Sequence, residues 1–179
     1  SSVLGAENYW PGWLGPKRDG WVKDFQPPKK WPAKLKQVWQ LKVGAGYGTP
    51  LVVGNHVYQH ARQGEEEVVW AVDLKTGKKV WRSSYNAPFK MGGGAEKHGK
   101  GPKSNPTYAD GRLFVMSIAG TLSAWDTASG KLLWRKNYNS RFKPSHPYWG
   151  MCNSPVVDGN RVIAHFGNVE KGVLVALDV

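Results

Sequence analysis

Hydrophobic and polar residues alternate over short runs along most of this chain, which is the period of two that a pleated β-strand requires. The clearest case lies at residues 104–135, where four such runs are separated by turn-forming residues. One turn consists of Asp110 and Gly111, which tolerate the positive φ of a type I′ hairpin turn. The stretch therefore predicts one antiparallel unit of four strands.

The same pattern recurs on both sides of this unit. Asp73, Asp126 and Asp178 end the third strands and are 53 and 52 residues apart, and Trp81 lies 53 residues before Trp134. We expect the first two aspartates to accept hydrogen bonds from the turns that follow them, and the tryptophans to pack between units. The residues that recur in a structural role are Asp73, Gly77, Trp81, Asp126, Gly130, Trp134 and Asp178.

A fixed period of this length, with four strands in each unit, predicts a β-propeller. The repeats lie at about 50–82, 106–135 and 155–179, and the last one is incomplete. Residues 35–179 are therefore expected to form propeller blades. Trp39 resembles the outer-strand tryptophan of a preceding blade that is otherwise missing.

The first part of the chain, residues 1–34, is rich in turn-forming residues and contains four tryptophans. Because tryptophan is costly to leave in water, we expect an irregular lead-in that packs on the propeller. Residues 1–6 are small and apolar, as at the end of a secretory signal or the start of a mature chain.

The string A-[VWL]-D-x-x-[ST]-G-K-x-x-W, preceded by P-x-V-x-G-N or P-x-x-x-D-G, resembles the blade repeat of the PQQ-like, quinoprotein-type β-propellers. The resemblance covers about residues 35–179, and the W-P-x-W-x-G-P lead-in is similar to that of secreted family members. It implies an all-β fold of four-stranded antiparallel blades, present here as an incomplete ring of about three. It also implies a periplasmic or secreted protein with a signal peptide.

The third repeat stops before its expected turn, fourth strand and tryptophan, whereas propeller rings usually take four to eight blades. We therefore expect this chain to be a fragment that needs further blades to close the ring. An unclosed ring leaves an open strand edge and apolar surface, so the chain expressed alone is predicted to self-associate.

The formal net charge is +12, and much of it lies in the lead-in and in the connections 83–103 and 136–154. In a propeller, the connections between blades emerge on one face, so one face is predicted to be more basic than the other. Such a face attracts acidic polymers or the acidic patch of a partner protein. The alternative is that these lysines only keep the protein soluble.

The connections between blades also carry the candidate binding residues. A ligand site on one rim is predicted to draw on His98, Lys100, Lys103, Asn105, Arg141, His146, Trp149 and Asn153. Residues 94–100 nearly spell a phosphate loop, but Gly101 follows where that motif needs Ser or Thr. Nucleotide hydrolysis is therefore disfavoured.

Several other classes are disfavoured by the sequence. No apolar run approaches the 18 residues of a membrane span. The histidines have no acidic partner at a ligand spacing, so we expect no metal site. Nucleic acid is not an expected partner, because the basic residues lack interleaved aromatic residues. Cys152, the one cysteine, is expected to be a small buried hydrophobic residue.

Two functions remain in view. The first is a non-catalytic binding or scaffold module, similar to the outer-membrane assembly lipoproteins of this fold, with no cofactor. The alternative is part of a dehydrogenase that oxidises alcohols or sugars with pyrroloquinoline quinone and calcium. The adjacent cysteine pair of that family is absent from this sequence, and no catalytic Asp or calcium cluster is identifiable. The sequence therefore favours the binding module.

Overall fold

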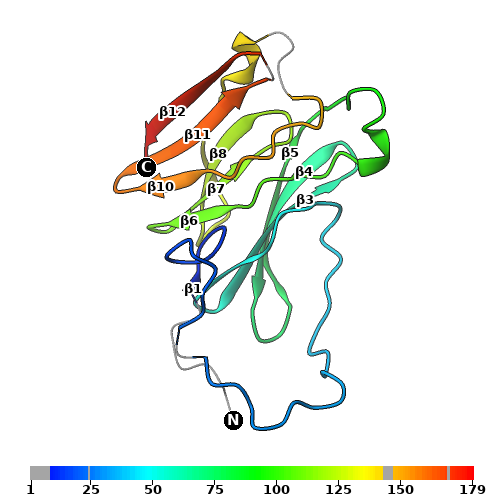
Figure 1. Ribbon diagram of the computed structural model, residues 1–179, viewed down its shortest axis with the longest axis vertical. Helices are drawn as coiled ribbons and strands as arrows, with labels where there is room; N and C mark the ends of the chain where they lie inside the picture. The colour runs from blue at the N-terminus through cyan, green and yellow to red at the C-terminus, as the bar shows by residue number, and fades with distance from the viewer. Residues whose placement is uncertain (1–8, 24, 143–146, 169) are drawn as a thin grey trace.

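The chain folds into three antiparallel β-sheets, and the computed structural model describes residues 9–23, 25–142, 147–168 and 170–179 (Figure 1). The first blade orders its strands β1-β2-β3-β4-β5, the second β6-β7-β8-β9 and the third β10-β11-β12. The strands are β1 (Tyr9–Trp10), β2 (Leu51–Val53), β3 (His56–Gln63), β4 (Glu66–Asp73), β5 (Lys79–Asn86), β6 (Thr107–Ala109), β7 (Arg112–Met116), β8 (Thr121–Asp126), β9 (Leu132–Asn137), β10 (Val156–Asp158), β11 (Arg161–Gly167) and β12 (Gly172–Asp178). The second sheet has its four predicted strands and the third lacks its outer strand as predicted, whereas the first sheet carries a fifth strand, β1, beside its predicted four.

The hairpins follow the turn residues of the repeat. Asp110 and Gly111 have φ values of 45° and 72°, as a type I′ turn requires. The pairing of the third and fourth strands is interrupted after Ala71 in the first blade and after Ala124 in the second. The same irregularity at the same repeat position indicates that it belongs to the blade design.

The aspartates at the ends of the third strands stabilise the turns that follow. Asp126 Oδ1 accepts hydrogen bonds from the backbone N–H and the hydroxyl of Ser129, and Asp73 accepts the same pair from Thr76. These hydrogen bonds hold the pKa of both carboxyl groups below the ordinary value. The structural role predicted for these two aspartates is confirmed.

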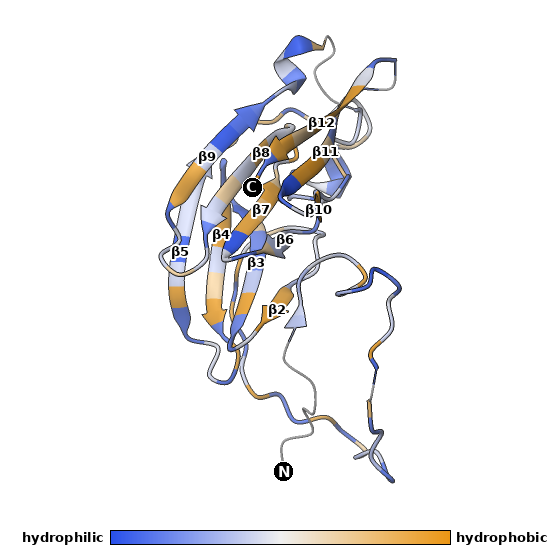
Figure 2. Ribbon diagram, turned by 90° about the vertical axis from the view of Figure 1, so that its left-hand side faces the viewer, coloured by the Kyte–Doolittle hydropathy of each residue, from blue (hydrophilic) through white to orange (hydrophobic). Residues whose placement is uncertain are grey.

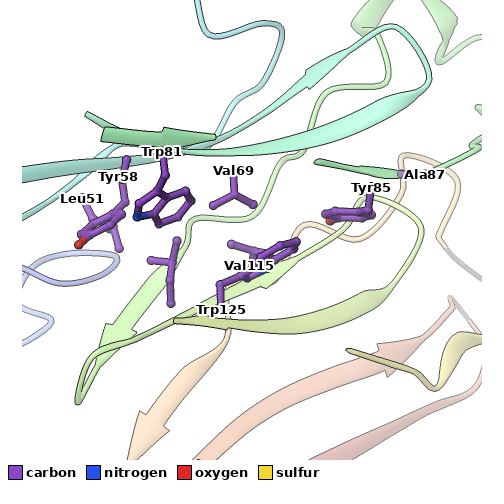
Figure 3. Packing of buried hydrophobic residues seen from close by; sticks show 10 residues of the cluster. Leu51, Tyr58, Val69, Trp81, Tyr85, Ala87, Val115 and Trp125 are labelled. Carbon is purple, nitrogen blue, oxygen red and sulfur yellow. The ribbon is translucent and has the colours of Figure 1, made fainter. Parts of the chain in front are cut away.

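The first and second blades pack face to face through an aromatic core, in which Trp81 and Val69 on one side face Val115 and Trp125 on the other (Figure 3). Between the second and third blades the core is built from buried aliphatic, methionine and phenylalanine side chains: Phe114, Met116, Leu122, Ala124, Met151, Val162, Ala164 and Phe166. Both faces of the second blade are therefore covered by neighbouring blades.

Trp81 fixes how the first blade docks on the second. Its indole N–H donates a hydrogen bond of 2.8 Å to the carbonyl oxygen of Thr127. A Cβ atom added to Gly130 would lie 2.6 Å from the Trp81 ring, so only glycine allows this contact. Trp81 is buried as predicted, whereas Trp134 is only partly buried against the second core.

Trp39 makes the same contact one blade earlier. Its indole N–H donates 2.8 Å to the carbonyl oxygen of Leu74, and a Cβ atom on Gly77 would lie 2.6 Å from its ring. Residues 39–43 thus cover the outer face of the first blade without forming a strand themselves. Trp39 occupies the position of an outer-strand tryptophan, as its sequence suggests.

Residues 9–18 of the lead-in run along the first strands of all three blades. β1 pairs with β2, the N–H of Tyr108 in β6 donates 2.7 Å to Pro11 O, and Arg18 Nη2 donates 2.7 Å to Val157 O in β10. β2 and β10 both lie next to β6, so these first strands face the axis of the array. The lead-in therefore occupies this axis.

Residues 19–23 and 25–34 of the lead-in are exposed and lie outside the blades as a loop (Figure 2). Trp21 and Trp31 are 75% and 59% exposed. The predicted packing of the lead-in on the propeller is therefore wrong for these two tryptophans, because the chain here runs outside the array. Among the described residues, no helix is long and apolar enough to cross a bilayer.

Candidate functional site

A pocket of about 660 Å³ opens between the lead-in and the first strands of the second and third blades; we call it the axial pocket. Residues 9–18 supply one wall, and β6 and β10 supply much of the other. Among the described lining residues, the charged side chains are Arg18 and Lys103, both cationic. The aromatic lining residues are Tyr9, Trp13, Tyr47 and Tyr108. The axial pocket thus combines aromatic rings with positive charge.

Lys103 lies at one end of the axial pocket. Its Nζ is 4.5 Å from the centre of the Tyr47 ring and donates a hydrogen bond of 3.4 Å to Gly99 O. Partial burial lowers the pKa of Lys103 below its ordinary value. A cation held over an aromatic ring and partly removed from water is well suited to pair with a ligand carboxylate.

Asn105 lines the pocket but also joins the three blades. Its side-chain oxygen accepts hydrogen bonds from the backbone N–H of Thr49 at 2.6 Å and from the Thr49 hydroxyl at 3.1 Å. Its own backbone N–H donates 2.9 Å to Ser154 Oγ. Asn105 therefore fixes the pocket wall in place.

Cys152 is exposed and lines the axial pocket, so the prediction of a buried cysteine is wrong. The preceding residue, Met151, takes the buried position in the second core, and neighbouring residues of an extended chain point in opposite directions. Partial burial raises the pKa of the Cys152 thiol, and the charge of Lys103 opposes that rise.

Four aromatic side chains form a second feature beside Lys103, which we call the aromatic platform (Tyr47, His98, Tyr148 and Trp149). The Tyr47 hydroxyl donates a hydrogen bond to His98 O. The His98 and Trp149 rings meet edge to face with centroids 4.6 Å apart, and Tyr148 meets Trp149 at 5.6 Å. His98 and Trp149, which come from different connections between blades, therefore lie side by side.

The loops that carry the platform pack tightly on one another. Gly92 N donates 3.3 Å to Tyr148 O, and a Cβ atom on Gly92 would lie 2.7 Å from the Tyr148 ring. Tyr47 N donates 2.8 Å to Pro102 O, and a Cβ atom on Gly101 would lie 2.7 Å from the backbone nitrogen of Gly46. These close approaches confine the Tyr148 ring and fix the backbone that carries Tyr47.

The remaining predicted site residues are placed apart from the axial pocket. Lys100 Nζ lies 3.3 Å from Glu65 Oε1, in an ion pair on the first blade. The Arg141 guanidinium lies 5.1 Å from the centre of the Tyr138 ring. The side-chain amide of Asn153 donates 3.1 Å to His165 O. His146 lies outside the described residues.

Sequence reasoning missed a buried polar cluster between the first and second blades. Glu67 is fully buried, and its Oε2 accepts 2.6 Å from the Tyr85 hydroxyl and lies 3.2 Å from His60 Nε2. Its Oε1 accepts 3.1 Å from Ile118 N in the second blade and lies 3.9 Å from Arg62 Nη1. The strand period could have revealed it, because Glu67 falls on the same face as buried residues of β4.

Two pKa values in this cluster are shifted. Burial by itself raises the pKa of Glu67, but hydrogen bonds from His60, Tyr85 and Ile118 outweigh it and leave the pKa below the ordinary value. Burial and the negative charge of Glu67 raise the pKa of Tyr85 well above its ordinary value. The arrangement supports a negative Glu67 that accepts hydrogen bonds from a neutral Tyr85.

The described residues do not fit a calcium-dependent cofactor site. They contain no group of three or more His, Cys, Asp and Glu side chains that could hold a metal ion. The described lining of the axial pocket also contains two cationic side chains and no carboxylate, which is the charged ligand that calcium prefers. No catalytic step is derived from these residues.

The blades of this chain are similar in sequence to those of known proteins. A family model described as outer membrane protein assembly factor BamB matches residues 32–89 and 65–179. BamB of Xanthomonas campestris pv. campestris is 29% identical over 69% of this chain and 32% of its own length. The match extends over the blades and most of the site residues.

Two dehydrogenases are similar to the same degree. The 1-butanol dehydrogenase (cytochrome c) of Thauera butanivorans is 29% identical over 78% of this chain and 20% of its own length. The polyvinylalcohol dehydrogenase of a Sphingopyxis species is 28% identical over 98% of this chain and 27% of its own length. The chain thus spans between 20% and 32% of the length of these curated relatives.

Solved structures show the same fold. A europium-containing methanol dehydrogenase matches with a TM-score of 0.57 and 26% identity, over 80% of this chain and 25% of that chain. BamB from Moraxella catarrhalis matches with a TM-score of 0.52 and 20% identity, over 79% of this chain and 39% of that chain. The predicted β-propeller, with its incomplete ring of about three blades, is confirmed.

Proposed function

The chain belongs to the PQQ-like repeat family that includes the outer membrane protein assembly factor BamB, and we propose that it is a non-catalytic binding module. Its proposed site is the axial pocket together with the aromatic platform, and its proposed partner is acidic. We further propose that it acts outside the cytoplasm, as a periplasmic or secreted protein.

One observation carries this proposal. The axial pocket and the platform meet at Lys103 and Tyr47, so that positive charge and aromatic surface are joined in one place. The charged groups among the described lining residues are both cationic. A pocket of this kind attracts carboxylate, sulfate or phosphate groups and offers apolar contact beside them.

A charge-reversal experiment tests the proposal. The chain is passed over immobilised poly-glutamate and immobilised polygalacturonate at low and high salt. Lys103→Glu is expected to abolish retention on at least one of these polymers. Lys29→Glu is the matched control, because it makes the same change in net charge on an exposed part of the lead-in. Equal loss in both variants would show that only net charge matters and would overturn the proposal.

The similarity to alcohol dehydrogenases supports a second candidate function, part of a quinone-dependent oxidoreductase. This candidate is tested by titrating pyrroloquinoline quinone with calcium and measuring dye-linked alcohol oxidation in the full-length protein. Tight cofactor binding with turnover would replace the binding module as the conclusion. We expect neither, because the described residues provide no carboxylate cage for the metal.

A further inference from the structure

Three rings of the aromatic platform are exposed to solvent. Tyr47, Tyr148 and Trp149 are 59%, 48% and 42% exposed. Tyr47 lies in the loop before β2, whereas Tyr148 and Trp149 are consecutive residues in the connection between the second and third blades. Apolar surface gathered at one place on a folded protein marks a site of interaction. Trp149 meets both His98 and Tyr148 edge to face, so an extended ligand can contact these neighbouring rings in turn.

The rings are also held in place before any ligand arrives. Gly92 lies against the Tyr148 ring, and the backbone of Tyr47 is hydrogen-bonded to Pro102. Ordering a mobile side chain on binding costs free energy, and a ring that is already confined avoids part of that cost. The platform therefore has the preorganisation of a binding surface.

One lysine, Lys103, contacts a ring of the aromatic platform directly. Lys103 contacts a platform ring, whereas Lys100 is paired with Glu65 and Arg141 lies over Tyr138. A single-stranded nucleic acid carries one phosphate for each base and binds in grooves with cations along the whole row. The platform instead suits a ligand with rings in series and isolated negative charges.

We infer that the ligand is an acidic polysaccharide, bound with sugar rings on the aromatic platform and a carboxylate against Lys103. A pyranose ring presents apolar C–H groups on its faces and hydroxyl groups at its rim. Tyr and Trp match this pattern, because each offers an apolar ring and a polar atom. The uronate carboxylate then forms a charge-assisted hydrogen bond with the Lys103 ammonium. This inference rests on the proposed binding function.

Calorimetric titration with three ligands tests the inference: a short oligogalacturonate, a neutral galactose oligomer of the same length and an oligothymidylate. The oligogalacturonate is expected to bind most tightly. Trp149→Ala is expected to weaken both sugar ligands about tenfold, which corresponds to about 1.4 kcal/mol, because it removes one ring from the platform. Lys103→Gln is expected to weaken only the acidic sugar. Trp21→Ala and Lys29→Gln, both outside the platform, are expected to change neither affinity.

A pair of glycine variants tests the platform geometry without removing a ring. A Cβ atom on Gly92 would lie 2.7 Å from the Tyr148 ring, whereas a Cβ atom on Gly93 meets only the Tyr148 hydroxyl at 3.9 Å. Gly92→Ala is therefore expected to displace Tyr148 and to weaken the oligogalacturonate, while Gly93→Ala is expected to leave its affinity unchanged. Circular dichroism of both variants shows that the fold is kept.

The outcomes separate this inference from the function on which it rests. Binding of poly-glutamate that depends on Lys103 but not on Trp149, without sugar binding, would overturn the polysaccharide and keep the acidic-partner module. A preference for oligothymidylate, or sugar binding that survives Trp149→Ala and Gly92→Ala unchanged, would also overturn it. Absence of binding to every acidic ligand would overturn both.

Discussion

At each of the two interfaces between blades, a buried side chain accepts a hydrogen bond from a backbone N–H of the next blade, but the two side chains differ in charge. At the first interface, between the first and second blades, the carboxylate of Glu67 accepts a hydrogen bond from Ile118 N and is surrounded by His60, Tyr85 and Arg62. At the second interface, the neutral amide of Asn139 accepts 2.8 Å from Gly167 N and donates 3.3 Å to Ala119 O. Each side chain satisfies a backbone group that would otherwise be buried without a partner.

This difference has an energetic consequence. A buried charged group depends on all of its partners, because removing one leaves an uncompensated charge or a buried donor. A neutral amide surrounded by apolar side chains carries a smaller penalty when it is removed. The first interface should therefore tolerate few substitutions, whereas the second should accept changes that conserve volume.

The largest expected effect comes from removing the charged group itself. Glu67→Ala is expected to lower the free energy of unfolding by about 3–5 kcal/mol, because the Tyr85 hydroxyl and Ile118 N lose a buried acceptor and Arg62 loses a buried ion-pair partner. Asn139→Ala is the matched change at the second interface and is expected to cost about 1–3 kcal/mol. Urea denaturation measures both. Equal losses would show that charge does not distinguish the interfaces.

The docking tryptophans provide the next comparison. Trp81→Ala is expected to cost about 3–5 kcal/mol, because the ring is buried and its N–H is bonded to Thr127. Trp134→Ala is expected to cost about 1–2 kcal/mol, since that ring is only partly buried. Thermal and urea unfolding of the two variants measure the difference. A Trp134 variant as unstable as the Trp81 variant would contradict this account.

A smaller effect is expected where glycine meets tryptophan. Gly130 and Gly111 both have positive φ, so alanine costs about 1 kcal/mol of backbone strain at either position. Only at Gly130 does the new Cβ atom meet the Trp81 ring, which adds about 1–3 kcal/mol of overpacking. Comparing the urea midpoints of Gly130→Ala and Gly111→Ala isolates the ring contact. Identical midpoints would contradict it.

The smallest expected effect is on how the free energy of unfolding depends on pH in acid. The pKa of Glu67 is lower in the folded protein than in the unfolded chain, so the unfolded chain binds the proton first as pH falls. The stability that Glu67 contributes is present above its unfolded pKa of about 4.5 and is lost as pH falls through the lower folded value. The free energy of unfolding that Glu67 contributes falls by at most about 1.4 kcal/mol for each pH unit.

Glu67→Gln is therefore expected to flatten the dependence of unfolding free energy on pH as the pH falls below the ordinary glutamate pKa of 4.5. Asp73 and Asp126 also have lowered pKa values, but they titrate in both proteins, so the difference between the two slopes reports Glu67. An Asn139→Ala variant is expected to keep the slope of the parent chain. A parallel pH profile for Glu67→Gln would contradict a negative Glu67.

The repeat made much of the fold predictable. The strands, the type I′ turn at Asp110 and the role of Asp126 follow from local sequence, because turn chemistry and strand period act over a few residues. The burial of Trp81 followed from its spacing. Local patterns carry no information on what lies across a sheet edge, so the pairing of β1 with β2 could not be predicted.

The candidate site was predictable only in part. His98 and Trp149 meet because connections between blades emerge on one face, which the repeat implies. Arg141 was expected at the same site but packs on Tyr138, since an arginine in an irregular loop has no period that fixes its direction. The exposure of Cys152 depended on whether it or Met151 entered the core. Composition alone cannot make that choice.

The course of the lead-in along the axis has a consequence for synthesis. The carbonyl that binds Arg18 belongs to Val157, 139 residues later in the chain, and contacts of such separation form slowly. Each blade can fold as it leaves the ribosome, because its hairpins are local. The axial pocket cannot, since one wall is made first and part of the other, β10, is made near the end. The axial pocket is therefore complete only once the third blade has joined the other two.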